Sequence, residues 1–271
     1  PSTLGHEKSI AIMNVLKHKT DSLPETGSLP AITATDVHLS YRSIVPVARR
    51  KEQERGKKSK RVEHFEALHG VSFTIDQGEI VGLVGRNGSG KSTLLRVLAG
   101  IFEPDRGVVD LHGHTVSLLA LGVGFQTQLS GRENIYLSGL LLGFSKQEID
   151  AQIQEIIDFS ELGKFIEKPV RTYSSGMQSK LGFAITAILK TDIILVDEVL
   201  SVGDAHFKKK SFAKMQELIS EKARTVVIVS HNSATIRSTC ERVIWLHDGD
   251  IKMMGETSLV MDLYDDFMTQ Y

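Results

Sequence analysis

A glycine-rich loop between an apolar segment and a helical segment constrains the fold of this chain more than any other feature. The loop, residues 85–93, reads Gly-Arg-Asn-Gly-Ser-Gly-Lys-Ser-Thr. The apolar residues 79–84 before it are typical of a buried strand, and residues 92–99 after it are typical of a helix that Gly100 ends. Because glycine has no Cβ, the backbone amides of the loop can turn inward around an anion. The pattern therefore predicts a phosphate-binding loop at the N-terminus of a helix.

Two side chains of this loop fit nucleotide chemistry. Lys91 can reach the β- and γ-phosphates of a nucleotide, and the Ser92 hydroxyl can bind Mg²⁺. The alternative is a glycine turn that binds nothing, and the strand and helix on either side argue against it. We expect the whole loop to bind the nucleotide: Gly85, Arg86, Asn87, Gly88, Ser89, Gly90, Lys91, Ser92 and Thr93.

Two adjacent carboxylates follow an apolar segment, residues 193–196, that is typical of a central strand. Asp197 lies at the carboxyl end of this strand, where open α/β sheets bind ligands, and it can hold Mg²⁺ through water. Glu198 comes next, so its side chain points elsewhere and can position an attacking water. An acidic pair at a strand exit can also be merely solvated, but the phosphate loop upstream favours the catalytic interpretation.

Two further signals are weaker on their own. His231 follows a predicted strand, residues 225–230, and a lone histidine at a strand end is usually structural. Its place one strand–helix unit beyond Asp197 favours a role in the site. Ser174 and Gly176 begin a predicted helix and offer a second N-terminus that can bind an anion, although Ser174 alone would be read as a helix cap.

The order of the elements predicts an α/β fold with a largely parallel sheet covered on both faces. Residues 31–41 alternate apolar and polar in the manner of an edge strand. Serines at 130 and 145, each followed three residues later by glutamate, match the capping box and predict helices near 131–142 and 146–158. We expect residues 1–30 to form an N-terminal arm and residues 31–271 one nucleotide-binding domain. That domain would hold a basic insertion at 42–64, a helical subdomain at about 130–190 and a closing helix at 256–271.

The charge balance excludes a whole-protein field that would attract nucleic acid or membrane, because the net charge is −1. Any such preference would be local, and residues 49–61 hold eight basic residues against two acidic ones. This segment could be a solvated loop, or it could contact lipid headgroups or the diphosphate of a lipid-linked substrate. It has no interleaved aromatic residues, so we expect no nucleic acid partner.

Composition also bears on the compartment. Cys240 is the only cysteine, which rules out an intrachain disulfide and fits a reducing cytosol. The chain has no apolar run of roughly 18 residues, and its N-terminus lacks a signal-peptide pattern. We expect a soluble protein that can dock onto a membrane partner.

The segments described above, taken in order, resemble the nucleotide-binding subunits of ABC transporters. The matching motifs are the Walker A loop at 85–93, the signature at 173–177, Walker B with its glutamate at 193–198, the D-loop at 201–204 and the switch histidine at 231. The resemblance covers roughly residues 31–255. It implies a P-loop NTPase of the ABC type, in which a mostly parallel core sheet is joined by an antiparallel β subdomain and an all-helical insert.

The resemblance also implies a head-to-tail homodimer that binds ATP between the Walker A loop of one subunit and the signature of the other. Ser92 and Asp197 would hold Mg²⁺. Glu198 would be the general base or water-orienting group. The remaining contacts to phosphate would come from Lys91 and the loop amides, from His231, and across the dimer from Ser174 and Gly176.

This chain departs from the ABC pattern in two places. The signature reads Tyr-Ser-Ser-Gly-Met at 173–177 instead of Leu-Ser-Gly-Gly-Gln, but its serine and second glycine survive. The usual glutamine-loop position falls at Leu121 or its neighbours, and Gln126, close by, is the candidate contact to Mg²⁺. Tyr41 is the candidate for stacking on adenine, and the alternative is a tyrosine that packs on the apolar surface of an edge strand.

Several stretches resemble the ATPase subunits of polysaccharide exporters, most of all those that export wall teichoic acid and next those that export O-antigen. The matching stretches are 122–137, 159–163, 173–177, 180–183 and 196–204. The resemblance implies an integral-membrane permease as partner, a lipid-linked polysaccharide as substrate and a peripheral location at the cytoplasmic face of the membrane. Some O-antigen relatives carry a C-terminal sugar-binding domain; we expect none after His231, which favours teichoic acid without excluding O-antigen. The alternatives are a non-transport ABC ATPase acting on DNA or ribosomes and an unrelated P-loop kinase.

Overall fold

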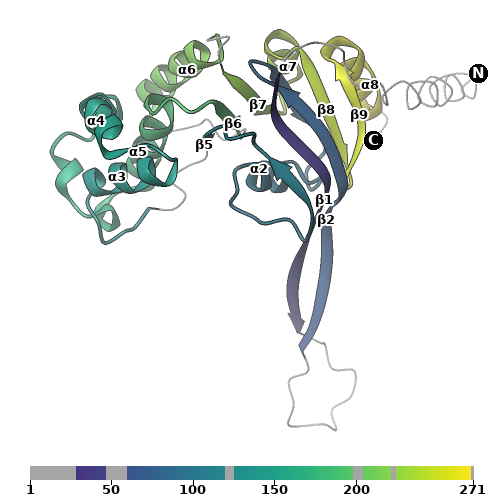
Figure 1. Ribbon diagram of the computed structural model, residues 1–271, viewed down its shortest axis with the longest axis horizontal. Coiled ribbons are helices and arrows are strands. Elements are labelled where there is room, and N and C mark those ends of the chain that lie inside the picture. Colours follow the sequence, from purple (N-terminus) through teal and green to yellow (C-terminus); the bar gives the residue numbers. More distant parts are fainter. Residues whose placement is uncertain (1–28, 47–59, 120–124, 198–203, 221–223, 270–271) are drawn as a thin grey trace, which may run out of the picture.

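The computed structural model describes residues 29–46, 60–119, 125–197, 204–220 and 224–269, and Figure 1 shows two sheets with helices around them. The larger sheet has six strands in the order β5-β6-β7-β3-β8-β9. Its first five strands pair in parallel and β9 pairs antiparallel to β8. Its strands are β3 (Ile80–Val84), β5 (Val116–Leu119), β6 (Ile193–Val196), β7 (Thr225–Val229), β8 (Arg242–His247) and β9 (Asp250–Glu256). The predicted α/β class with a mostly parallel core sheet is confirmed.

A second sheet is antiparallel and has the order β2-β1-β4. Its strands are β1 (Pro30–Pro46), β2 (Lys60–Asp76) and β4 (Arg106–Asp110). The prediction of an edge strand at 31–41 is wrong, because β1 lies between its two neighbours. The alternation of apolar and polar residues indicates only that one face of the strand is buried and the other is exposed. A central antiparallel strand has the same pattern as an edge strand.

The β1–β2 hairpin is longer than the sequence pattern indicated. The sequence predicts an insertion at 42–64, yet β1 continues to Pro46, which pairs with Lys60 of β2. Figure 1 shows this end of the hairpin projecting away from the body of the molecule. The pairing of β1 with β2 therefore extends beyond the alternation at 31–41. Residues 47–59, which carry most of the predicted basic segment, lie outside the described residues.

Two cores lie on opposite faces of the six-stranded sheet. Alternate residues of β6, β7 and β8 point to one face or the other, as the period of two requires. On one face they pack with α2 and the antiparallel sheet, and on the other with α6, α7 and α8. These helices are α2 (Lys91–Leu98), α6 (Ala205–Ser220), α7 (Ser233–Thr239) and α8 (Thr257–Thr269).

A group of helices with its own core lies to one side of the sheets (Figure 1). Both predicted capping boxes are present, with Ser130 and Ser145 each accepting from the backbone N–H of the glutamate three residues on. Two 3₁₀ helices between α4 and α5 were not predicted. The elements of the group are α3 (Gly131–Leu141), α4 (Lys146–Ser160), η1 (Gly163–Glu167), η2 (Val170–Thr172) and α5 (Ser175–Ile188). Among the described residues, no helix has the length and apolar character to cross a membrane.

Candidate functional site

The phosphate loop connects β3 to α2, and it requires glycine where its backbone packs against β2. Gly90 caps α2 with a left-handed φ of 103°. A Cβ at this position would lie 2.7 Å from the Ala67 carbonyl oxygen, so a larger residue would both strain the backbone and displace β2. Gly88, with φ 83°, faces open space, because nothing lies within 4 Å of its would-be Cβ. The loop is therefore packed tightly against the protein on one side and is open on the other.

The lysine of the loop folds back over it. Lys91 is buried, and its Nζ donates to the carbonyl oxygens of Gly85 at 2.7 Å and Arg86 at 2.8 Å. This places a positive charge beside the N-terminus of α2, where the helix dipole is also positive. The hydroxyl of Ser89 is buried and has no hydrogen-bond partner among the described residues. A buried polar group of this kind is satisfied when a phosphate oxygen or a water reaches it.

Tyr41 lies beside the phosphate loop although it is far from it in sequence. Its hydroxyl is 3.0 Å from Thr93 Oγ1 on α2, and its ring meets the edge of Phe102 at 6.1 Å between centroids. About a third of the residue is exposed, at 36%. The contact places Tyr41 next to the last residue of the loop 85–93. Stacking on adenine stays a prediction.

The carboxyl ends of β3, β7 and β6 bring the remaining predicted groups to the same edge of the sheet as the phosphate loop. β7 lies between the other two strands, and all three are parallel. Asp197 follows β6 and is half-buried, and His231 follows β7 and is exposed. Glu198 lies outside the described residues. The arrangement agrees with the general position of ligand sites in open α/β sheets.

Ser92 and Asp197 fit Mg²⁺ by the chemistry of their donors. Both offer oxygen, the ligand that Mg²⁺ prefers, and both side chains are only partly buried. Within the described ranges, no group of three or more His, Cys, Asp or Glu side chains could hold a metal ion by itself. An ion held by two protein oxygens would complete its shell with phosphate oxygens and water, as Mg²⁺ does in nucleotide sites.

Two hydrogen bonds to the Asn134 side chain hold the backbone of Gln126 in place. The Gln126 N–H donates to Asn134 Oδ1 at 2.8 Å, and Asn134 Nδ2 donates to the Gln126 carbonyl at 3.1 Å. Asn134 is fully buried on α3, whereas the Gln126 side chain is exposed. The residue is therefore presented by a fixed turn, and its contact to Mg²⁺ stays a prediction. Leu121 and its neighbours up to 124 lie outside the described residues.

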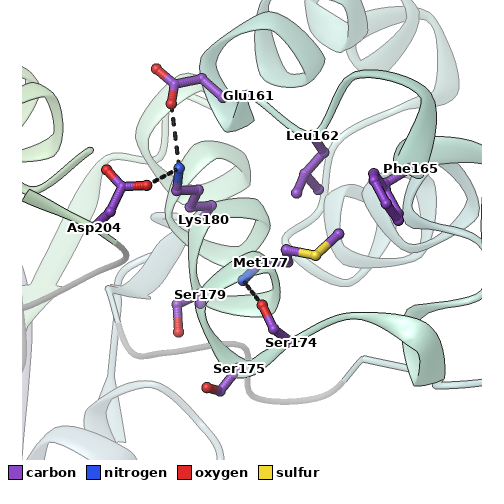
Figure 2. Close-up of a pocket in the computed structure, with 10 residues that line it drawn as sticks. Glu161, Leu162, Phe165, Ser174, Ser175, Met177, Ser179, Lys180 and Asp204 are labelled. Carbon is purple, nitrogen blue, oxygen red and sulfur yellow. Dashed lines mark hydrogen bonds and ion pairs between the residues drawn. The ribbon is translucent and has the colours of Figure 1, made fainter. Parts of the chain in front are cut away.

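A pocket of about 590 Å³ opens beside the N-terminus of α5 (Figure 2). Ser174 caps this helix by accepting from the Met177 N–H at 3.2 Å. No residue of the loop 85–93 lines this pocket. The sequence predicted Ser174 and Gly176 here but missed the ion pairs of Lys180, whose partners come from distant segments. The lining residues are Glu161, Leu162, Phe165, Ser174, Ser175, Gly176, Met177, Ser179, Lys180 and Asp204.

The fold and the loop define an α/β protein of the P-loop type, and comparison with known proteins gives its family. The chain belongs to the ABC transporter family, whose model matches residues 68–201. It is 44% identical over 202 residues to the O-antigen export system ATP-binding protein RfbB of Klebsiella pneumoniae, a match over 74% of this chain and 82% of that protein. It is 46% identical over 214 residues to the teichoic acids export ATP-binding protein TagH of Bacillus anthracis, a match over 79% of this chain and 39% of that protein.

The relatives differ from this chain in length, and the solved structures resemble it in fold. The chain spans less than half the length of several curated relatives that it matches. Among solved structures, the dimeric ATP-binding cassette MJ0796 bound to ADP and Pi has a TM-score of 0.62 at 23% identity, over 83% of this chain and 98% of that one. At that identity the likeness shows the fold alone, and it confirms the ABC cassette fold.

Proposed function

We propose that this chain is the ATP-hydrolysing part of an ABC exporter. The observation that carries the proposal is the phosphate loop, where Lys91 lies folded over a glycine turn that is open on one side. This loop stands at the same sheet edge as Asp197 and His231. Such an arrangement suits phosphoryl transfer, in which catalysis is mostly positioning and stabilisation of charge.

Within one subunit, we assign each group a role; the described positions of Lys91, Asp197 and His231 support theirs. Lys91 and the loop amides bind the β- and γ-phosphates, and His231 contacts the γ-phosphate. Ser92 and Asp197 hold Mg²⁺, which neutralises charge on the phosphate oxygens when bound. Glu198 orients the water that attacks the γ-phosphate.

Across the dimer, Ser174 and Gly176 contact the nucleotide held by a second copy of the chain. The proposal is supported by the separation of the two motifs, because the pocket beside Ser174 takes no residue from the phosphate loop. The N-terminus of α5 adds partial positive charge, which favours a phosphate. A complete site therefore needs two chains.

We further propose that the exporter moves a lipid-linked cell-envelope polysaccharide, with wall teichoic acid as the first candidate. The TagH relatives support teichoic acid, whereas the RfbB protein of Klebsiella pneumoniae, of which the chain covers 82%, supports O-antigen as the second. The chain would act at the cytoplasmic face of the membrane, bound to an integral-membrane permease. The apolar surface on α3, where Leu140 and Leu141 are exposed, is a candidate for that docking.

Reconstitution tests both the assignment as an ATPase and the choice of polysaccharide. The chain is combined with a candidate polysaccharide permease in liposomes, and ATP hydrolysis is measured with lipid-linked teichoic acid, with lipid-linked O-antigen and without polymer. We expect basal ATPase activity and stimulation by one polymer. Stimulation by O-antigen alone would contradict teichoic acid as the substrate. Absence of ATP binding and of hydrolysis in every arm would contradict the ATPase assignment itself.

A further inference from the structure

The turn between β8 and β9 packs against the phosphate loop. Its glycine, Gly249, is buried, and the Gly249 N–H donates to the carbonyl oxygen of Ser89 in the loop at 3.2 Å. The Gly249 carbonyl oxygen accepts from the backbone N–H of His69 on β2 at 3.0 Å. One residue therefore joins the phosphate loop to β2 through its two backbone groups, although the three segments lie far apart in the chain.

The conformation and the surroundings of Gly249 both favour glycine. The residue is left-handed, with φ 83°, and a Cβ there would lie 3.0 Å from His69 Nδ1 and 3.1 Å from the Ala67 carbonyl oxygen. The same Ala67 oxygen lies 2.7 Å from the would-be Cβ of Gly90 in the loop. The turn, β2 and the loop thus meet at one carbonyl group, and a side chain at position 249 would push the turn away from the loop.

The hydrogen bond from Gly249 orients the peptide group between Ser89 and Gly90. Across a trans peptide bond, a carbonyl and the N–H of the next residue point in opposite directions, and the described residues have no cis peptide bond. Because the Ser89 carbonyl points to Gly249, the Gly90 N–H points away from the turn. This N–H makes no hydrogen bond to the other described residues, so it can donate to an anion in the loop.

We propose that Gly249 is a positioning residue for phosphate binding. By holding the Ser89 carbonyl, it directs the Gly90 N–H at the phosphate groups of the nucleotide. Gly90 is the N-cap of α2, where the partial positive charge of the helix also favours an anion. Gly249 itself does not touch the nucleotide. The inference rests on the proposed function, since that function assigns ATP to this loop.

Titration calorimetry of Gly249→Ala with Mg-ATP and with inorganic tripolyphosphate tests this role. We expect the Kd of each ligand to rise about tenfold, because both bind through the phosphate loop. In steady-state kinetics KM for ATP should rise by a similar factor. The kcat at saturating ATP should change less than about threefold, because the lost contact holds the substrate and the transition state alike. A loss of fold stability alone would leave both Kd values of the folded protein unchanged.

Two controls separate this role from backbone strain and from the other contacts of the turn. Gly113→Ala places alanine at a similar left-handed φ of 79°, but its Cβ would meet nothing within 4 Å. Asp248→Asn removes the charge that lies 3.4 Å from His247 Nε2 and leaves the backbone of the turn intact. Both variants should bind ATP and tripolyphosphate as the parent protein does.

Gly249→Asn keeps the proposal testable if Gly249→Ala folds poorly, because asparagine adopts the left-handed conformation more readily than alanine. Its Cβ would still lie beside His69 and Ala67, so we expect a loss of affinity for both ligands. Parental affinity in a folded Gly249 variant, a loss for ATP but not for tripolyphosphate, or an equal loss in Gly113→Ala would overturn the positioning role. A parent protein that binds no ATP would instead overturn the proposed function.

Discussion

Single residues account for the shape of the phosphate loop. Gly90 combines a left-handed backbone with an approach to the Ala67 carbonyl oxygen that leaves no room for a side chain. Lys91 then places its ammonium group on the carbonyl oxygens of Gly85 and Arg86. The loop can therefore hold its open shape before a nucleotide binds, and binding does not require the backbone to be ordered first.

Replacing Gly90 by alanine should damage both folding and binding. A left-handed alanine costs about 1–2 kcal/mol, and the contact with Ala67 adds to this cost. We expect Gly90→Ala to weaken ATP binding more than about tenfold, as measured by titration calorimetry. Gly113→Ala is the control, because Gly113 is also left-handed, with φ 79°, but its would-be Cβ meets nothing within 4 Å. Equal ATP affinity in the two variants would contradict this account of the loop.

The single cysteine offers a residue-scale probe of the core. Cys240 is 7% exposed, and burial raises the pKa of its thiol to about 12. Because the thiolate is the reactive form, we expect almost no alkylation of the native protein at pH 8 and rapid labelling in denaturant. Mass spectrometry after iodoacetamide treatment measures this difference. Fast labelling of the folded protein would show that α7 and the sheet do not cover the thiol as described.

Candidate residues of the site could be predicted where the neighbouring residues in the sequence carried the pattern. The candidates were named from their places next to predicted strands and helices: the loop 85–93, Asp197, His231 and Ser174. Tyr41 was a candidate before its neighbours were known, but its contact with Thr93 and the ion pair of Lys180 with Asp204 join segments far apart in the chain, and no local pattern encodes such pairs. The contacts of Tyr41 with Thr93 and Phe102 could be seen only once the strands had been placed.

Hydrogen bonds at the helix N-termini stabilise the helical group. The capping boxes at Ser130 and Ser145 satisfy backbone N–H groups at the start of α3 and α4, and the sequence spacing predicted both. The β1–β2 hairpin was less predictable, because its backbone pairing continues to Pro46 and Lys60, beyond the alternation at 31–41. Local chemistry therefore predicted the helices of this protein better than its long strands.

The cap of α4 should contribute measurably to stability. Ser145→Ala removes the acceptor for the Glu148 N–H, and we expect a loss of ~1 kcal/mol in the free energy of unfolding. Glu155→Ala, at an exposed position on the same helix, should change stability much less. Urea unfolding followed by circular dichroism measures both. A loss in Glu155→Ala as large as that in Ser145→Ala would contradict the role of the cap.

The same cap predicts a dependence on pH. Hydrogen bonds from the Ser145 side chain and backbone lower the pKa of Glu148 below its usual value. A lowered native pKa stabilises the fold above the unfolded pKa, and this contribution is lost as pH falls through the native pKa. We therefore expect the stability difference between the parent and Ser145→Ala to shrink below about pH 4. A difference that grew on acidification would contradict the assignment.

At the scale of the whole molecule, the sheet and the helical group carry separate sets of residues, which the proposed function joins across a dimer. The phosphate loop, Asp197 and His231 stand at the carboxyl edge of the parallel sheet, while Ser174 and Gly176 stand on the pocket beside α5. The sequence predicted this division through resemblance to ABC cassettes, and the fold agrees with that class. The order of the strands could not be read from local patterns, because it depends on packing between segments far apart in the chain.

ATP-dependent dimerisation of Glu198→Gln tests the central claim most directly. This variant should bind ATP and hydrolyse it very slowly, so that a dimer closed on the nucleotide accumulates. In sedimentation velocity with Mg-ATP we expect the mass of two chains, and the mass of one chain without nucleotide. Adding Ser174→Arg should leave ATP binding intact but keep the protein monomeric. A protein that binds ATP yet sediments as a monomer in both variants would contradict a site shared by two copies.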